Sequence, residues 1–168
     1  MIAALGLVAV GCASPEPTNE PDSWSALISG EWSLPAGVEG YRCVYATLDR
    51  DLTIGALRLA ASEGTHHVTL GVVDEYDGPD GFVPCTAADI GDTLLFGAGL
   101  GTTPLELPEG TAIRLEAGTR LVVNLHLLNA SADPLSGASG VEIREVGGAN
   151  PKRLWEFRDA TMTIAVGN

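Results

Sequence analysis

Positive charge is scarce in this chain of 168 residues. Nine lysines and arginines stand against 22 aspartates and glutamates, which gives a formal net charge of −13 at pH 7. Nucleic acids and anionic lipid surfaces are bound chiefly through lysine and arginine, so this balance disfavours both as partners. No serine or cysteine stands in a recognisable catalytic-triad motif. No stretch repeats its apolar residues at the helical period of 3.6, which disfavours a helical fold.

Turn-forming residues are abundant instead. The chain has 21 glycines and ten prolines, and 45% of its residues are hydrophobic, which is enough for a core. Short apolar stretches alternate with these turns, as is typical of strands. We expect strands at 41–48, 52–60, 65–74, 92–96, 111–115, 120–129, 141–146 and 161–166. This pattern predicts an all-β protein, an antiparallel two-sheet β-sandwich of jelly-roll type with about nine strands.

The N-terminus is typical of an exported bacterial lipoprotein. Ile2–Val10 is an apolar run that is too short to span a bilayer but suits a signal segment. Ala9–Cys12 resembles the site at which a lipid is attached to cysteine, although no basic residue precedes Arg42. We therefore expect a signal segment at 1–12, lipidation of Cys12, a flexible tether at 13–36 and the sandwich at 37–168. The protein would be anchored to the cell envelope, touching the membrane only through its lipid.

Two cysteines remain once Cys12 is assigned to the lipid. Outside the cytoplasm an even pair usually forms a disulfide, so we expect one between Cys43 and Cys85, closing a loop of about forty residues. The alternative is that one of the two is a thiolate ligand for copper. Because they lie on opposite sides of the tandem histidines in the sequence, the disulfide is the preferred interpretation.

The three histidines of the chain fall in two predicted strands. His66 and His67 are adjacent, and His126 lies in an apolar strand in which its ring nitrogens need partners. Imidazole is the commonest protein ligand for copper and zinc. Neighbouring strand residues point to opposite faces, so the pair reaches one ion only at a strand end, at a bulge, or through different ring nitrogens. Alternatively, His126 is a hydrogen-bonded core residue and the pair is merely exposed.

Short motifs around these histidines resemble a known family. They occur in order at 65–68 (THHV), 84–85 (PC), 107–110 (LPEG) and 121–126 (LVVNLH). Together they are similar to the N-terminal domain of the copper type II, ascorbate-dependent monooxygenases, such as peptidylglycine α-hydroxylating monooxygenase and dopamine β-monooxygenase. The resemblance covers roughly 38–146. It implies a jelly-roll domain that holds one copper through His66, His67 and His126, with ascorbate as the reductant.

The departures from this family limit the expected activity. Val68 stands where the family usually has methionine, and Leu127 where it commonly has an aromatic residue. The second copper of the family needs two further histidines and a methionine, but this chain has no fourth histidine, and Met162 is its only methionine besides Met1. In the family the first copper passes an electron from ascorbate, and the second binds oxygen beside the substrate. Only the electron-transfer role of the first copper has matching residues in this chain.

These observations favour an exported copper-binding domain that resembles the electron-transfer half of the family. Its expected partners are a small-molecule reductant and a second copper domain or partner protein. Two alternatives stay open: a one-copper oxidoreductase in its own right, and a structural lipoprotein sandwich without chemistry. Zinc at the same three histidines is chemically open as well. A separation above about 8 Å between His126 and the tandem pair would rule out any shared ion, because metal–nitrogen bonds are near 2 Å.

Overall fold

The computed structural model describes residues 23–146 and 153–155, and all of its regular structure in those ranges is β-strand. The strands are β1 (Ser25–Leu34), β2 (Glu39–Thr47), β3 (Leu52–Ala60), β4 (Thr65–Val73), β5 (Gly81–Pro84), β6 (Thr93–Gly99), β7 (Leu105–Glu106), β8 (Thr111–Leu115), β9 (Arg120–Leu128), β10 (Leu135–Glu145) and β11 (Arg153–Trp155). The all-β prediction is therefore confirmed. No helix in this described part is long and apolar enough to cross a membrane.

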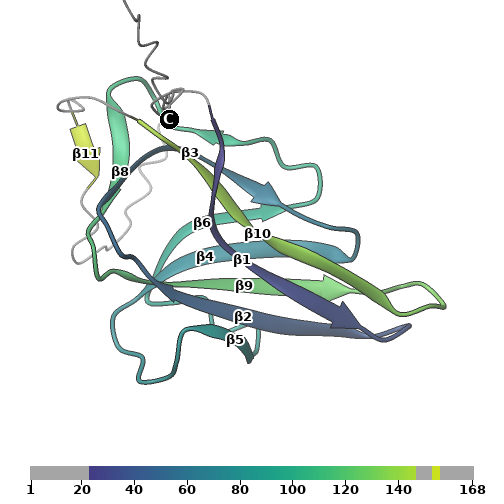
Figure 1. Ribbon diagram of the computed structural model, residues 1–168. Coiled ribbons are helices and arrows are strands. Elements are labelled where there is room, and N and C mark those ends of the chain that lie inside the picture. The colour runs from purple at the N-terminus through teal and green to yellow at the C-terminus, as the bar shows by residue number, and fades with distance from the viewer. Residues whose placement is uncertain (1–22, 147–152, 156–168) are drawn as a thin grey trace, which may run out of the picture.

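The strands form two sheets packed face to face (Figure 1). One sheet has the order β1-β10-β3-β8-β11, with β7 also paired to β3, and the other has the order β5-β2-β9-β4-β6. Successive long strands alternate between the sheets except β4 and β6, which share one sheet, and β1-β10-β3-β8 faces β2-β9-β4-β6. This is the strand order of a jelly roll, as predicted. All strand pairs are antiparallel except β11 with β8.

The central strand β9 is buried on both faces. Its inward side chains are aliphatic and lie fully buried in the core between the sheets: Leu121, Val123, Leu125 and Leu127. Its outward side chains are Val122, Asn124 and His126. Val122 packs with Tyr45 and Cys43, and the Asn124 amide donates to the carbonyls of Thr86 and Asp89. A loop thus covers the middle of this outer face.

The domain begins earlier than predicted. Residues 25–34 were expected to belong to a tether, but they form β1, which pairs with β10 along its whole length. Ile28, Trp32 and Leu34 of this strand are buried in the core. Residues 1–22, with the expected signal segment, Cys12 and the rest of the tether, lie outside the described residues, as does the strand expected at 161–166.

The disulfide prediction is confirmed. Cys43 on β2 is bonded to Cys85, which follows β5, across a Cα–Cα distance of 5.7 Å. The bond ties the covering loop to the outer face of the sheet, and Cys43 is fully buried. Because both sulfurs are used, the alternative of a copper thiolate ligand at either cysteine is wrong.

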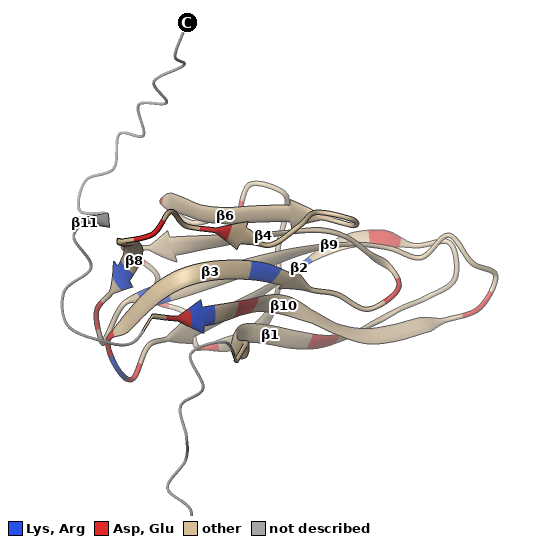
Figure 2. Ribbon diagram, turned by 90° about the horizontal axis from the view of Figure 1, so that it is seen from above, with Lys and Arg blue, Asp and Glu red and all other residues tan. Residues whose placement is uncertain are grey.

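Five arginines form ion pairs with acidic residues of neighbouring strands and loops. Figure 2 shows their blue segments beside red acidic ones on β3, β8 and β10. The pairs are Arg50–Glu145, Arg58–Glu142, Arg114–Asp51, Arg120–Asp80 and Arg144–Glu106. Within residues 23–146 the positive charge of the arginines is therefore largely neutralised by acidic partners.

Candidate metal site

The three histidines meet on the outer face of the β4–β9 pair. His67 on β4 lies directly opposite His126 on β9. The register shifts between Thr65 and His67, so that His66 is an extra residue without a partner on β9. Such a bulge breaks the strict alternation of side chains along the strand. Of the arrangements considered from the sequence, the bulge is the one that brings both tandem histidines to the same place.

The bulge follows a tightly anchored turn. Gly64 has a φ of 92°, a left-handed conformation that favours glycine. The buried Thr65 hydroxyl donates to the Ser62 carbonyl at 2.8 Å and lies 2.6 Å from the Ser139 hydroxyl of the opposite sheet. Ser139 also accepts a hydrogen bond from the Trp32 indole at 2.9 Å. This buried polar network fixes the first residue of β4 and therefore the point at which His66 is displaced.

The geometry of the cluster suits a small metal ion. The Nδ1 atom of His67 lies 3.1 Å from Nδ1 of His66 and 3.1 Å from Nδ1 of His126. One ligand atom from each histidine lies within 4.8 Å of the others. An ion held tetrahedrally by nitrogens at about 2.0 Å needs those nitrogens about 3.3 Å apart. The two distances from His67 are therefore close to the spacing that one shared ion requires.

Hydrogen bonding alone does not satisfy this arrangement. The Nδ1 atom of an imidazole carries either one proton or one in-plane lone pair, so it makes one well-aligned hydrogen bond. His67 Nδ1 has two imidazole nitrogens at 3.1 Å, and it can pair well with only one of them. A cation placed among the three lone pairs satisfies all of them at once. The cluster is thus better suited to a metal than to a hydrogen-bonded network.

His126 is held on three sides. Its Nε2 lies 2.6 Å from the Glu39 carboxylate, and its Nδ1 faces His67. The Tyr41 ring stacks on it with centroids 4.4 Å apart and planes 5° from parallel. His126 is 7% exposed, so the expectation that its nitrogens need partners is confirmed. The tandem pair is not merely exposed, however, because His67 is half-buried and its Nδ1 lies 3.1 Å from Nδ1 of His126.

The electrostatics favour the metal-binding form of His67. Burial lowers the pKa of His67 below its ordinary value of 6.5, and the neighbouring charges of His126 and then His66 lower it further. Metal binding needs a neutral imidazole with a free lone pair. The cluster therefore keeps His67 ready to bind a cation at neutral pH.

No family model matches this chain, and no curated protein matches it. The resemblance to the copper monooxygenases therefore rests on the motifs described above and stays a prediction. The site itself stands on the geometry of its side chains. A group of three histidines that can hold a metal ion is present, whichever family the chain belongs to.

The sequence did not identify two residues of the site, Glu39 and Tyr41. Tyr41 lay in a predicted strand, and Glu39 lay two residues before its expected start. Both face the same side as His126 because Glu39 is paired with Leu128 and Tyr41 with His126. The only signal in the sequence was that a histidine in an apolar strand requires a polar partner.

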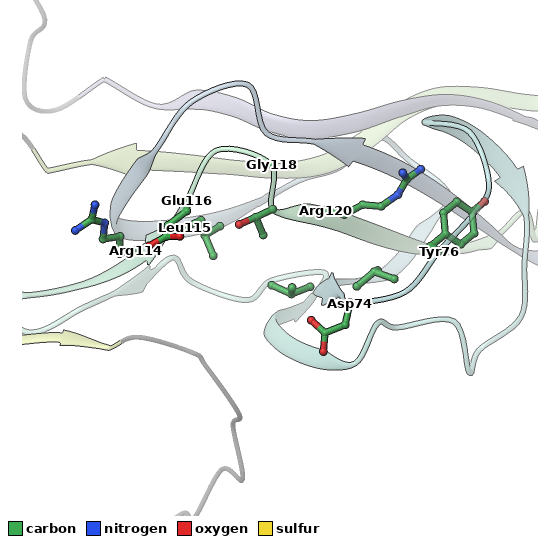
Figure 3. A pocket seen from close by; sticks show the side chains of 10 residues that line it. Asp74, Tyr76, Arg114, Leu115, Glu116, Gly118 and Arg120 are labelled. Carbon is green, nitrogen blue, oxygen red and sulfur yellow. The ribbon is translucent and has the colours of Figure 1, made fainter.

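A cavity of about 370 Å³ lies at the other end of β4 and β9 (Figure 3). Its lining includes Asp74, Tyr76, Arg114, Glu116 and Arg120, and none of the three histidines. Arg120 lies over the Tyr76 ring at 4.7 Å and pairs with an aspartate of the same loop. These contacts hold the loop between β4 and β5 in place, and the cavity does not lie beside the histidines.

Proposed function

We propose that this protein is an exported copper-binding domain that holds one copper ion through His66, His67 and His126. Its role is electron transfer or copper handling, with a small reductant such as ascorbate as the electron source. The observation that carries the proposal is the convergence of the three Nδ1 atoms, with His67 3.1 Å from both of its neighbours. The spacing supports an ion bound by all three.

Copper is favoured over zinc by ligand chemistry and by the family resemblance. Three neutral imidazoles suit several divalent ions, but at a given nitrogen site Cu(II) binds more tightly than Zn(II). Neutral imidazoles also suit Cu(I), because an uncharged ligand can bind a singly charged ion as well as a doubly charged one. The motif resemblance points to copper independently of this argument. Zinc is therefore the competitor against which the affinity measurement is made.

The position of the site supports exchange with solvent molecules. His66 is exposed, His67 is half-buried and His126 is buried, so the cluster opens outward on one side. Three protein ligands leave a coordination position for water or a small molecule. A reductant from solution would reach the ion from the side of His66. The buried side, with His126, would hold the ion in place.

Export is supported by the disulfide. Disulfides form and persist in oxidising compartments, and Cys43–Cys85 ties a surface loop to the sheet. Together with the lipobox-like Ala9–Cys12, this supports the proposal of a lipid-anchored protein of the cell envelope. The copper site would then lie outside the cytoplasm, where small reductants and partner proteins reach it.

A one-copper oxidoreductase is the less favoured function. That function needs a substrate pocket beside the ion, and the cavity of Figure 3 lies at the far end of the same strands. The structural-lipoprotein alternative predicted separated histidines, whereas one ligand nitrogen from each lies within 4.8 Å of the others. Electron transfer and copper handling need only the ion and an accessible edge, so they fit the observed surface better.

The test is a metal-affinity measurement on histidine variants of the full chain. We expect the wild type to bind one Cu(I) or Cu(II) and to prefer copper to zinc in competition with chromophoric chelators. His126→Ala should weaken copper by at least about tenfold, since even partners of metal ligands typically account for 10–100-fold. His66→Ala serves as a second variant because this exposed residue can be replaced without disturbing the core. Unchanged stoichiometry and affinity in His126→Ala would refute the proposed site.

A further inference from the structure

We propose that Glu39 is a positioning residue that selects which ring nitrogen His126 presents to the metal. Its carboxylate accepts a hydrogen bond from the Nε2–H group of His126 and so leaves the Nδ1 lone pair directed at His66 and His67. This inference rests on the proposed metal site, but its first consequence is a property of the metal-free protein. It assigns a role to a residue that the motif resemblance does not include.

The strand register brings Glu39 to His126. Glu39 lies opposite Leu128 and Tyr41 lies opposite His126 in the β2–β9 pairing, so all four side chains share the outer face of the sheet. The Glu39 oxygen lies 2.6 Å from His126 Nε2, a short distance for such a bond. The Glu39 carboxylate therefore lies at one ring nitrogen of His126 and His67 at the other.

The stacked tyrosine cannot do the same work. The Tyr41 ring, 4.4 Å away and 5° from parallel, fixes the plane of the His126 ring. A half-turn of the imidazole about its Cβ–Cγ bond keeps that plane and nearly the same outline. It would, however, put a carbon–hydrogen group where Nδ1 now faces His67. Only a partner that distinguishes nitrogen from carbon can select between the two orientations.

Glu39 makes this distinction through its hydrogen bond. An ionised carboxylate only accepts hydrogen bonds, so it favours the orientation and tautomer that place an N–H at the Nε2 position. A neutral imidazole has one such proton, and the other nitrogen is then a free lone pair. Metal-ligating histidines commonly have a partner of this kind, and its loss typically lowers metal affinity by 10–100-fold. Here Glu39 is such a partner of His126.

The exposure of Glu39 makes the inference testable. The Glu39 side chain is 58% exposed, whereas the His126 side chain is 9% exposed. Replacing Glu39 therefore removes a surface carboxylate while the β2–β9 backbone pairing stays. Glu63, also exposed and three residues before His66, offers a matched control, because its removal changes the net charge equally and it takes part in none of the contacts described above for the three histidines.

The first measurement is the tautomer of His126 in metal-free protein, by long-range proton–nitrogen NMR. With only three histidines the ring signals are few. We expect His126 to be the Nε2–H tautomer in the wild type and in Glu63→Ala. In Glu39→Ala the Nδ1–H form should become populated, and Glu39→Gln should restore the wild-type form through its amide oxygen. A wild-type His126 protonated at Nδ1, or an unchanged tautomer in Glu39→Ala, would overturn the inference.

The second measurement is the affinity of the same four proteins for Cu(I) and Zn(II). Glu39→Ala should still bind one ion but about 10–100-fold more weakly, Glu39→Gln should recover part of the loss, and Glu63→Ala should stay within about twofold of the wild type. Wild-type affinity in Glu39→Ala would contradict the positioning role. If the wild type bound no metal, the proposed function would fail, and the tautomer result would still decide the role of Glu39.

Discussion

Replacing the disulfide should separate the stability of the sandwich from the geometry of the metal site. The perturbation is the double variant Cys43→Ala and Cys85→Ala. The bond joins residues 42 positions apart and holds the loop after β5 against β2. The histidines, by contrast, are positioned by the β4–β9 register and its bulge. The two features should therefore respond differently.

The expected loss of stability follows from the length of the closed loop. In the chain-entropy model, opening a loop of this size costs about 4 kcal/mol of unfolding free energy, because the reduced unfolded chain is freer. In the folded state the loop stays attached through Asn124, whose amide donates to the carbonyls of Thr86 and Asp89. With a urea slope near 2 kcal/mol/M, the unfolding midpoint should fall by about 2 M.

The assay pairs two readouts on the same protein. Urea unfolding is followed by tryptophan fluorescence, for which the buried Trp32 is a probe. Copper affinity is measured on the folded variant, and we expect it to stay within about threefold of the wild type. Wild-type protein reduced with a thiol is the control for the substitutions themselves. A stability loss under about 1 kcal/mol, or a loss of copper affinity above about tenfold, would refute the reasoning.

Three further predictions concern His67, the turn that anchors the bulge, and the packing of two glycines in the sheet. The stability of the metal-free domain should decrease as the pH falls below about 6.5, because the pKa of His67 is lower in the folded protein than in the unfolded chain, which therefore takes up the proton first. Urea midpoints measured between pH 8 and pH 5 should fall accordingly, and this fall should be smaller in His67→Asn. Thr65→Val should lower the free energy of unfolding by about 1–3 kcal/mol and weaken copper binding, because it breaks the buried network that anchors the bulge. Wild-type copper affinity in this variant would contradict the anchoring role. Gly71→Ala should be destabilising by about 1–3 kcal/mol, because its Cβ would lie 2.0 Å from the Ile90 carbonyl oxygen. Gly97→Ala should have little effect, because its Cβ would meet nothing nearer than 3.9 Å. Equal urea midpoints for the two variants would argue against this packing.

The jelly roll could be predicted because its central strands carry a strong local pattern. The predicted bounds of β3 and β8 match the structure, and β9 differs by one residue. β1 was missed because its buried residues, Ile28, Trp32 and Leu34, are interrupted by a bulge and by exposed polar positions. The short strands β5 and β7 have too few residues to show a period at all.

The candidate site could be predicted only in part, because some of its residues come together only through the pairing of strands that are distant in the sequence. The three histidines were visible as residue types, and a bulge was one of the arrangements that would let the tandem pair converge. Glu39 and Tyr41 join the site only through the pairing of β2 with β9, residues that are 87 positions apart in the case of Glu39 and His126. No local pattern encodes such a pairing. The identity of the metal is likewise a matter of affinity, which the strand pattern does not determine.

The central claim is that one ion binds to the three Nδ1 atoms of His66, His67 and His126. The most direct test is anomalous diffraction from crystals of the copper-loaded protein, recorded on both sides of the copper absorption edge. We expect a single strong peak about 2 Å from each of the three Nδ1 atoms, with the His126 Nε2 still hydrogen-bonded to Glu39. A peak bound through fewer than three histidines, or placed away from the β4–β9 pair, would contradict it.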